Sequence, residues 1–128
     1  MPKLLPPTQR EKNRYLAFEI ASEQKYSRDE IVKAIWNAAL RYLGEKGATA
    51  TSLWIMDWDE TAQRGIIKVN HTSVDDIKAS LTLLSEIKKG ENRYAAAYRT
   101  LTVSGTLKKL REKTGMKAQR TNHIKRPV

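Results

Sequence analysis

Residues 52–71, "SLWIMDWDETAQRGIIKVNH", contain two short apolar runs separated by a polar turn. The first run, residues 52–60, is rich in the aromatic and large apolar side chains that favour strands, and residues 66–71 form the second. Between them "TAQRG" has the composition of a turn, in which Gly65 is expected to adopt a positive φ. This stretch predicts a β-hairpin in the middle of the chain.

A helix is predicted before the hairpin. Ser27 followed three residues later by Glu30 matches a capping box, in which each side chain accepts a hydrogen bond from the other residue's amide. Apolar residues then recur every three or four positions, which indicates a helix with a wide buried stripe and with Trp36 in the core. Gly44 or Gly47 is expected to end this helix.

A second helix is predicted after the hairpin, over residues 73–89. Ser73 is the expected N-cap, and two aspartates in the first turn suit the positive end of the helix dipole. Lys88 and Lys89 suit the negative end, and Gly90 is expected to stop the helix.

One strand is predicted outside each helix. Residues 14–21 alternate between apolar and polar positions, and residues 97–103 form a strand with Leu101 and Val103 directed inward. The order β-α-β-β-α-β is that of the ferredoxin-like, RRM-like α+β fold, with a four-stranded antiparallel sheet and two helices on one face. A short basic helix over about residues 106–113 is expected to follow.

This pattern divides the chain of 128 residues into three parts. Residues 1–13 contain three prolines and are interpreted as a basic arm. Residues 14–116 form the ferredoxin-like domain. Residues 117–128 lack periodicity and are interpreted as a basic tail.

The composition excludes several classes of protein. Without cysteine, the chain has no disulfide, no thiolate metal site and no cysteine nucleophile. No apolar run approaches the ~20 residues that a membrane helix needs, and residues 1–7 lack the apolar core of a signal peptide. We therefore expect a cytoplasmic protein.

The net charge of +10 is concentrated at the two ends of the chain. Residues 1–14 hold four basic residues against one acidic residue, residues 107–128 hold eight against one, and the segment between them is balanced. A neutral body with basic ends is typical of proteins that hold a polyanion, and nucleic acid is the first candidate. Solubility or an acidic protein partner are the alternatives.

No catalytic or metal-binding constellation is evident in the sequence. Asp57 and Asp59 fall on one side of a predicted strand, but no further ligand cluster accompanies them, so a solvated strand end is the preferred interpretation. Neither His71 nor His123 has an acidic residue at a suggestive spacing, and no glycine-rich phosphate loop occurs. We expect no catalytic residue, and no metal or cofactor bound by the chain itself.

The strand after the turn matches only the start of the RNA-recognition signature. Arg64 and Gly65 are present, but the aromatic residues that should follow are absent. A base cannot stack on Ile66 as it would on phenylalanine. The preferred interpretation is a hairpin that packs or faces a protein, rather than one that reads loose bases.

A protein partner is predicted for the strand before the turn. Trp54, Met56 and Trp58 alternate with other apolar residues, so both faces of this strand are apolar. In a sheet that is covered on one side only, a second apolar face indicates contact with another protein or with a second copy. Trp54, Met56 and Trp58 are therefore the candidate partner-binding residues.

Residues 101–113, "LTVSGTLKKLREK", place three small residues between the last strand and the basic helix. The start of a helix offers unpaired N–H groups and a partial positive charge, and small residues let a phosphate approach the backbone. An ordinary N-cap followed by a solvated basic helix explains the pattern equally well.

Three stretches together resemble protein component 2 of archaeal ribonuclease P, whose eukaryotic relatives are small subunits of nuclear ribonuclease P and RNase MRP. They are "NRYLAFEI" at residues 13–20, "RGIIKVNH" at residues 64–71 and the stretch at residues 101–113. The resemblance spans roughly residues 13–113, and the Val-Ser-Gly-Thr-Leu-Lys run is its strongest part.

This resemblance implies a protein subunit of ribonuclease P, which removes the 5′ leader of precursor tRNA by hydrolysing one phosphodiester bond. It implies that the RNA subunit with its Mg²⁺ ions is the catalyst, that the chain alone is inactive, and that the chain pairs with another ribonuclease P protein subunit as a heterotetramer. It also favours phosphate contact at the small turn. The residues expected to contact RNA are Arg10, Lys12, Arg14, Ser104, Gly105, Thr106, Lys108, Lys109, Arg111 and Lys113.

Two rival interpretations remain open. A free-standing ferredoxin-like RNA chaperone would bind many RNAs with similar affinity and would need no protein partner. A metal-dependent nuclease acting alone would need Asp57, Asp59 or Glu60 to bind magnesium.

Overall fold

The computed structural model describes residues 12–115, so most of the predicted arm and all of the predicted tail lie outside the described residues. Five strands, three α-helices and one 3₁₀ turn make up this part of the chain. Their order is β1 (Asn13–Ser22), α1 (Arg28–Ala50), β2 (Trp54–Asp59), β3 (Arg64–Asn70), η2 (His71–Ser73), α2 (Val74–Thr82), β4 (Glu86–Lys89), β5 (Asn92–Ser104) and α3 (Leu107–Thr114).

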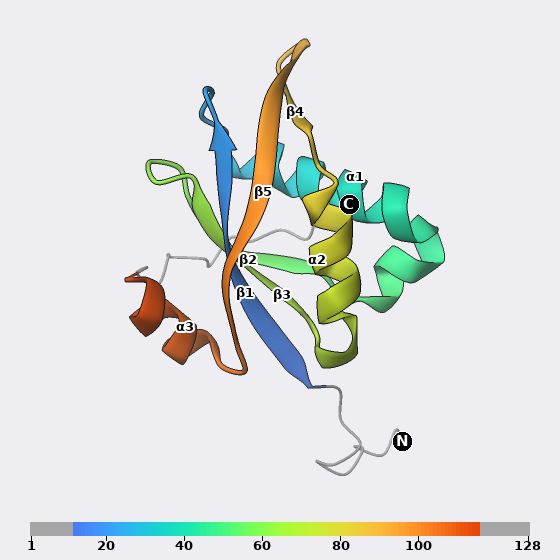
Figure 1. Ribbon diagram of the computed structural model, residues 1–128, viewed down its shortest axis with the longest axis vertical. Coiled ribbons are helices and arrows are strands. Elements are labelled where there is room, and N and C mark those ends of the chain that lie inside the picture. Colours follow the sequence, from blue (N-terminus) through green and yellow to red (C-terminus); the bar gives the residue numbers. More distant parts are fainter. Residues whose placement is uncertain (1–11, 116–128) are drawn as a thin grey trace, which may run out of the picture.

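The strands form one antiparallel sheet in the order β2-β3-β1-β5-β4, with β1 in the middle between β3 and β5. α1 and α2 pack on one face of this sheet, and α3 packs on the other (Figure 1). The α+β fold with two helices on one face is as expected. The sheet has five strands, however, so the prediction of a four-stranded sheet is wrong.

The extra strand comes from the end of the predicted second helix. α2 stops at Thr82, and β4 pairs with β5 through a tight turn in which Gly90 has a φ of 66°. Within β4 only Ile87 is buried, between an exposed glutamate and an exposed lysine, which is the alternation of a strand. Ser73 precedes α2 as expected, but its side chain makes no capping hydrogen bond.

α1 begins at the predicted capping box. The Ser27 hydroxyl accepts from the Glu30 amide at 3.4 Å, and the Glu30 carboxylate accepts from the Ser27 amide at 2.9 Å. Gly44, with a φ of 74° and a ψ of 171°, is not helical and ends the first run of helical turns, as predicted for one of the two glycines, and further helical turns then continue to Ala50. No helix in the described part of the chain, α1 included, is long and apolar enough to cross a membrane.

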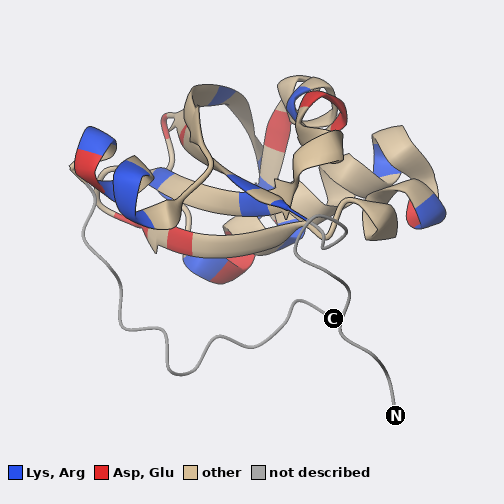
Figure 2. Cartoon of the chain, turned by 90° about the horizontal axis from the view of Figure 1, so that it is seen from below, with Lys and Arg blue, Asp and Glu red and all other residues tan. Residues whose placement is uncertain are grey.

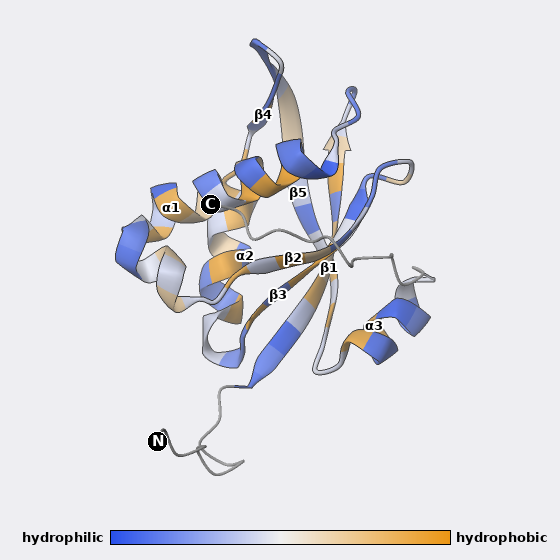
Figure 3. Ribbon diagram, turned by 180° about the vertical axis from the view of Figure 1, so that it is seen from behind, coloured by the Kyte–Doolittle hydropathy of each residue, from blue (hydrophilic) through white to orange (hydrophobic). Residues whose placement is uncertain are grey.

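The main core lies between the sheet and helices α1 and α2. Figure 3 shows hydrophobic residues along the central strands and in bands on both helices. Phe18 is fully buried at its centre, and its ring stacks on Trp58 at 5.8 Å and on Tyr98 at 5.4 Å between ring centroids. Trp36 is partly buried and packs against this core, as predicted.

A β-bulge makes two side chains of β5 face differently from the prediction. Leu101 and Val103 were both predicted to face inward, but the pairing of β1 with β5 shifts by one residue between Ala17 and Phe18. The extra residue reverses the alternation of side chains along the strand. Val103 therefore packs on the main core, whereas Leu101 packs on the α3 side of the sheet.

Gly65 lies inside β3 and does not adopt a positive φ, contrary to the prediction. The turn residue at positive φ is Gln63, with a φ of 55°. Its side-chain amide accepts from the amide of Tyr26 at 3.0 Å and donates to the carbonyl of Tyr26 at 3.2 Å, which holds the turn against the start of α1. Gly65 is needed for space instead, because a Cβ there would lie 2.7 Å from the Asp57 carbonyl and from the Phe18 ring.

Tyr98 supports a prediction on alkaline stability. Burial raises the pKa of Tyr98 to about 12, although a hydrogen bond from Thr100 opposes this. Because the pKa is higher in the folded state, the neutral Tyr98 hydroxyl contributes its full stabilisation below about pH 10, the ordinary pKa of tyrosine. This contribution is lost as the pH rises towards 12. Urea unfolding should show the free energy of unfolding falling over this range, and falling less steeply in Tyr98→Phe. Equal slopes in the two proteins would contradict the assignment.

Candidate nucleic-acid interface

The small turn between β5 and α3 is a self-capped helix start. Ser104 ends β5 opposite Tyr15 of β1, and its hydroxyl accepts from the Thr106 amide at 3.3 Å. Thr106 is the N-cap of α3, and its hydroxyl accepts from the Lys109 amide at 3.3 Å. The turn thus satisfies two of its own amides, and a phosphate contact at Ser104, Gly105 and Thr106 stays a prediction.

The structure brings two predicted RNA-contacting segments together at this turn. A Cβ placed on Gly105 would lie 3.8 Å from the guanidinium of Arg14, which also donates to the Asn13 carbonyl at 3.0 Å. Lys12 is exposed just before β1, and Arg10 lies outside the described residues. The start of β1 and the start of α3 therefore form one basic corner of the molecule.

α3 has one apolar side and one basic side. Leu110 is fully buried against Ala17 of β1 and Ile66 of β3, with Leu107 packed beside it. The lysines expected to contact RNA point the other way, and α3, on the left of Figure 2, carries broad basic bands. All three of them are exposed: Lys108, Lys109 and Lys113.

Arg111, the fourth predicted contact on α3, is not part of this exposed side. Its guanidinium makes two hydrogen bonds of 2.9 Å to the two carboxylate oxygens of Asp57 on β2. The hydrogen bond that Arg111 donates to Asp57 raises the pKa of Arg111, with burial opposing it. Asp57 is itself fully buried, so the prediction of a solvated carboxylate there is wrong.

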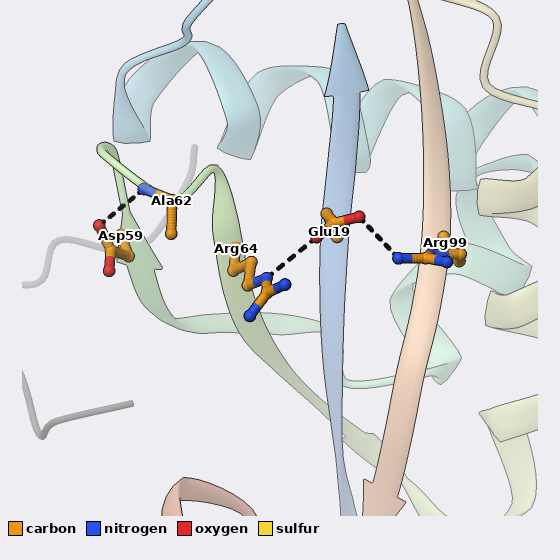
Figure 4. A network of polar contacts seen from close by, with 5 residues as sticks. All are labelled: Glu19, Asp59, Ala62, Arg64 and Arg99. Atoms are coloured by element: carbon orange, nitrogen blue, oxygen red, sulfur yellow. Dashed lines mark hydrogen bonds and ion pairs between the residues drawn. The ribbon is translucent and has the colours of Figure 1, made fainter. Parts of the chain in front are cut away.

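Asp59, the second of the three carboxylates considered as metal ligands, also has hydrogen-bond partners. Asp59 accepts from the amide of Thr61 at 3.0 Å and from that of Ala62 at 3.1 Å, which stabilises the turn between β2 and β3. Figure 4 shows the contact with Ala62. Within residues 12–115, no three histidine, aspartate or glutamate side chains converge as a metal site would require.

A second basic group lies on the part of this sheet face beyond α3. Glu19 of β1 accepts from Arg64 of β3 at 3.0 Å and from Arg99 of β5 at 2.8 Å (Figure 4). The hydrogen bond from Arg64 is the main cause that lowers the pKa of Glu19; burial opposes it, and Arg99 lowers it further. Two arginines share one carboxylate, so this patch keeps a net positive charge. Sequence reasoning missed it because only the strand register aligns the three residues.

A family model described as the Rpp14/Pop5 family matches residues 14–114, which is the whole described domain apart from its ends. The chain belongs to the Rpp14/Pop5 family.

Relatives in archaea agree with this family assignment. The chain is 48% identical over 112 residues to "Ribonuclease P protein component 2" of Pyrococcus furiosus, covering 88% of this chain and 90% of that protein. The protein of the same name from Thermococcus kodakarensis is 44% identical, with the same coverage, and that from Methanobrevibacter smithii is 35% identical over 83% of this chain and 91% of the relative.

A solved structure shares the fold. A chain in the cryo-EM structure of yeast ribonuclease MRP superposes with a TM-score of 0.62, covering 84% of this chain and 94% of that chain. The two sequences are only 16% identical, so the likeness establishes the fold alone.

The position of α3 explains why this family member lacks the stacking aromatics of an RNA-recognition sheet. Ile66 lies near the middle of β3 and is fully buried in the apolar cluster to which α3 contributes Leu107 and Leu110. A base could not reach an aromatic ring at that position while α3 stays in place. The centre of the sheet therefore holds a helix where the sheet of an RNA-recognition motif offers bases a flat surface.

The predicted partner-binding residues do not share one face of the sheet. A bulge in β2 between Ile55 and Asp57 puts Met56 beside α3 and turns Trp58 into the main core, where only 5% of it is exposed and its indole donates to the Tyr26 carbonyl at 3.0 Å. The expectation that Trp58 lies on an outer apolar face is therefore wrong. A partner contact through Trp54 and Met56, both half-buried, stays a prediction.

Lys68 is a further basic residue that sequence reasoning missed. It lies on β3 between Tyr15 of β1 and Trp54 of β2, which are its direct partners in the sheet. All three are half-buried and lie in the row next to the one that α3 covers. The alternation within "IIKVN" could have placed Lys68 on this face, but its neighbours depend on pairing with two other strands.

Proposed function

We propose that the chain, as a protein subunit of ribonuclease P, supports the RNA subunit in removing the 5′ leader of precursor tRNA. Its family and its 48% identity to an archaeal ribonuclease P protein component 2 support the subunit assignment. The supporting role is suggested by the side chains, because Asp57 is bound to Arg111 and Asp59 to turn amides. In this proposal the RNA subunit holds the Mg²⁺ ions and carries out the hydrolysis.

The exposed lysine side of α3 is the observation that carries the proposed RNA contact. Lys108, Lys109 and Lys113 project from a helix that is anchored on the sheet by a buried leucine and an ion pair. Arg14 adds charge at the start of the same helix. Such a surface suits the phosphate backbone of a structured RNA, since backbone contacts position a protein without reading bases.

A second ribonuclease P protein subunit is the proposed protein partner, in a two-by-two heterotetramer. Among the described residues, the large apolar side chains that are most exposed are Tyr42 at 51% and Leu83 at 66%. Both line one groove formed by α1, the end of α2 and β4. Exposed apolar area of this kind favours a protein contact, and it lies on the face of the sheet opposite α3.

Reconstitution of the enzyme tests the proposed function. Cleavage of a precursor tRNA by the cognate RNA subunit and the other protein subunits should be measured at low Mg²⁺, with and without this chain. We expect the chain to raise the cleavage rate in the mixture and to cut nothing alone. Cleavage by the chain alone would overturn the proposed division of labour. No effect in any mixture would favour a free-standing RNA chaperone.

A further inference from the structure

The ion pair between Asp57 and Arg111 is largely enclosed. Asp57 has no exposed surface, and 23% of the Arg111 side chain is exposed. Both carboxylate oxygens are engaged, one by Nε and the other by Nη2, each at 2.9 Å. A two-point contact of this kind fixes the orientation of the guanidinium as well as its distance.

The bulge in β2 is what aims Asp57 at α3. Ile55 pairs with Ile67 on the main-core side, and strict alternation would send Asp57 to the same side. The register shift instead places Asp57 opposite Ile66, which lies under α3. A buried carboxylate in the apolar core would be very costly, whereas on this side it meets a matching arginine.

The pair adds to the buried leucines a second anchor that fixes which side of α3 faces away from the sheet. α3 has eight residues, Leu107–Thr114, and a helix this short is marginal without tertiary contacts. Leu110 packs against Ala17 and Ile66 on the central strands, and Arg111 is hydrogen-bonded to Asp57 on β2. With these two adjacent residues held, the lysines at positions 108, 109 and 113 can only project outward.

We propose that Asp57 and Arg111 are positioning residues for RNA binding, which hold α3 so that its lysines meet the phosphate backbone. This inference rests on the proposed function. Arg111 in this role touches no phosphate, and Asp57 favours binding although it carries a negative charge.

If Arg111 instead contacts RNA directly, the substitution Asp57→Asn should change the RNA affinity in the opposite direction from that expected for a positioning role. In Asp57→Asn the guanidinium would lose its ionic partner and one of its two acceptor oxygens, and the net charge would rise by one, so a phosphate-binding Arg111 would tighten RNA binding. A positioning role predicts weaker binding, because a loosened α3 must be ordered again when the RNA binds. The sign of the change in affinity therefore separates the two roles.

The test compares Asp57→Asn with Glu112→Gln in the full chain. Both substitutions remove one negative charge, but Glu112 is exposed on α3 itself. Binding to the ribonuclease P RNA and hydrogen exchange of the α3 amides in the free protein are measured for each. For Asp57→Asn we expect about tenfold weaker binding and faster exchange in α3. For Glu112→Gln we expect unchanged exchange and binding at least as tight as that of the wild type.

Each outcome bears on one of the two proposals. Wild-type protein that does not bind the RNA contradicts the proposed function. Wild-type protein that binds, with Asp57→Asn binding equally well or more tightly, overturns the positioning role alone. Should Asp57→Asn fail to fold, Asp57→Glu keeps the charge and displaces the carboxylate by one methylene. Weaker binding and faster α3 exchange in that variant support the positioning role, and unchanged binding overturns it.

Discussion

Replacing Lys108, Lys109 and Lys113 together by glutamate is expected to abolish most RNA binding by the chain while its fold stays intact. The three side chains are exposed and face away from the sheet. If each contributes about 1.5 kcal/mol through a charge-assisted hydrogen bond to phosphate, the loss weakens binding by roughly a thousandfold. Arg111 is left unchanged, because reversing its charge would place two carboxylates together in a buried site.

The salt dependence of binding gives a second measure of the same contacts. If about six phosphates are neutralised in the wild type, the logarithm of affinity should fall with the logarithm of salt concentration at a slope near −5. The triple variant should lower the steepness of this slope by roughly 2 to 3. Circular dichroism and urea unfolding show whether the fold is kept, since exposed substitutions usually change stability by less than about 0.5 kcal/mol.

A matched triple variant on the other face of the sheet controls for net charge. Lys33, Lys46 and Lys78 are exposed on α1 and α2, and their replacement by glutamate changes the charge by the same amount. We expect that variant to lose far less RNA affinity. Equal losses in the two triple variants would mean that overall charge attracts the RNA, and that α3 is not the contact.

Gly65→Ala is expected to cost about 2–3 kcal/mol of folding free energy, which is the range for overpacking a tight site. The new Cβ would lie 2.7 Å from the Asp57 carbonyl oxygen and 2.7 to 2.8 Å from two carbons of the Phe18 ring. Neither neighbour can yield easily, because one is backbone in β2 and the other is a ring stacked between Trp58 and Tyr98. Thermal unfolding should show a midpoint lower by roughly 10 °C or more.

Gly105→Ala is the matched control for this substitution. Its Cβ would meet only the Arg14 guanidinium at 3.8 Å, which is ordinary contact, and the backbone there has no positive φ. We expect a change in unfolding free energy within about 0.5 kcal/mol. A Gly65→Ala protein as stable as Gly105→Ala would show that the Phe18 ring has room that the structure does not indicate.

Features that depend on residues close in the chain could be predicted. The capping box of α1 joins Ser27 to Glu30, and the buried alternation of β1 joins Leu16, Phe18 and Ile20. Each of these signals involves residues only a few positions apart, so the order of the first six predicted elements followed from them. The end of α2 was mistaken because Lys88, Lys89 and Gly90 also suit the end of a helix, and only pairing with β5 makes a strand of this segment.

The candidate RNA surface could be predicted in its composition but not in its geometry. The sequence alone determined that the chain has basic ends, a small turn before a basic helix, and a neutral α+β body. Only the tertiary structure decided which basic residues are free to act. Bulges of one residue in β2 and β5 reverse the facing of Asp57 and Leu101, and no local pattern records them. Arg111 then pairs with a carboxylate 54 positions away, while its neighbours Lys108 and Lys109 stay exposed. The physical reason is that the residue type fixes the charge of a side chain, whereas the neighbouring side chains in the fold decide whether that charge can contact RNA.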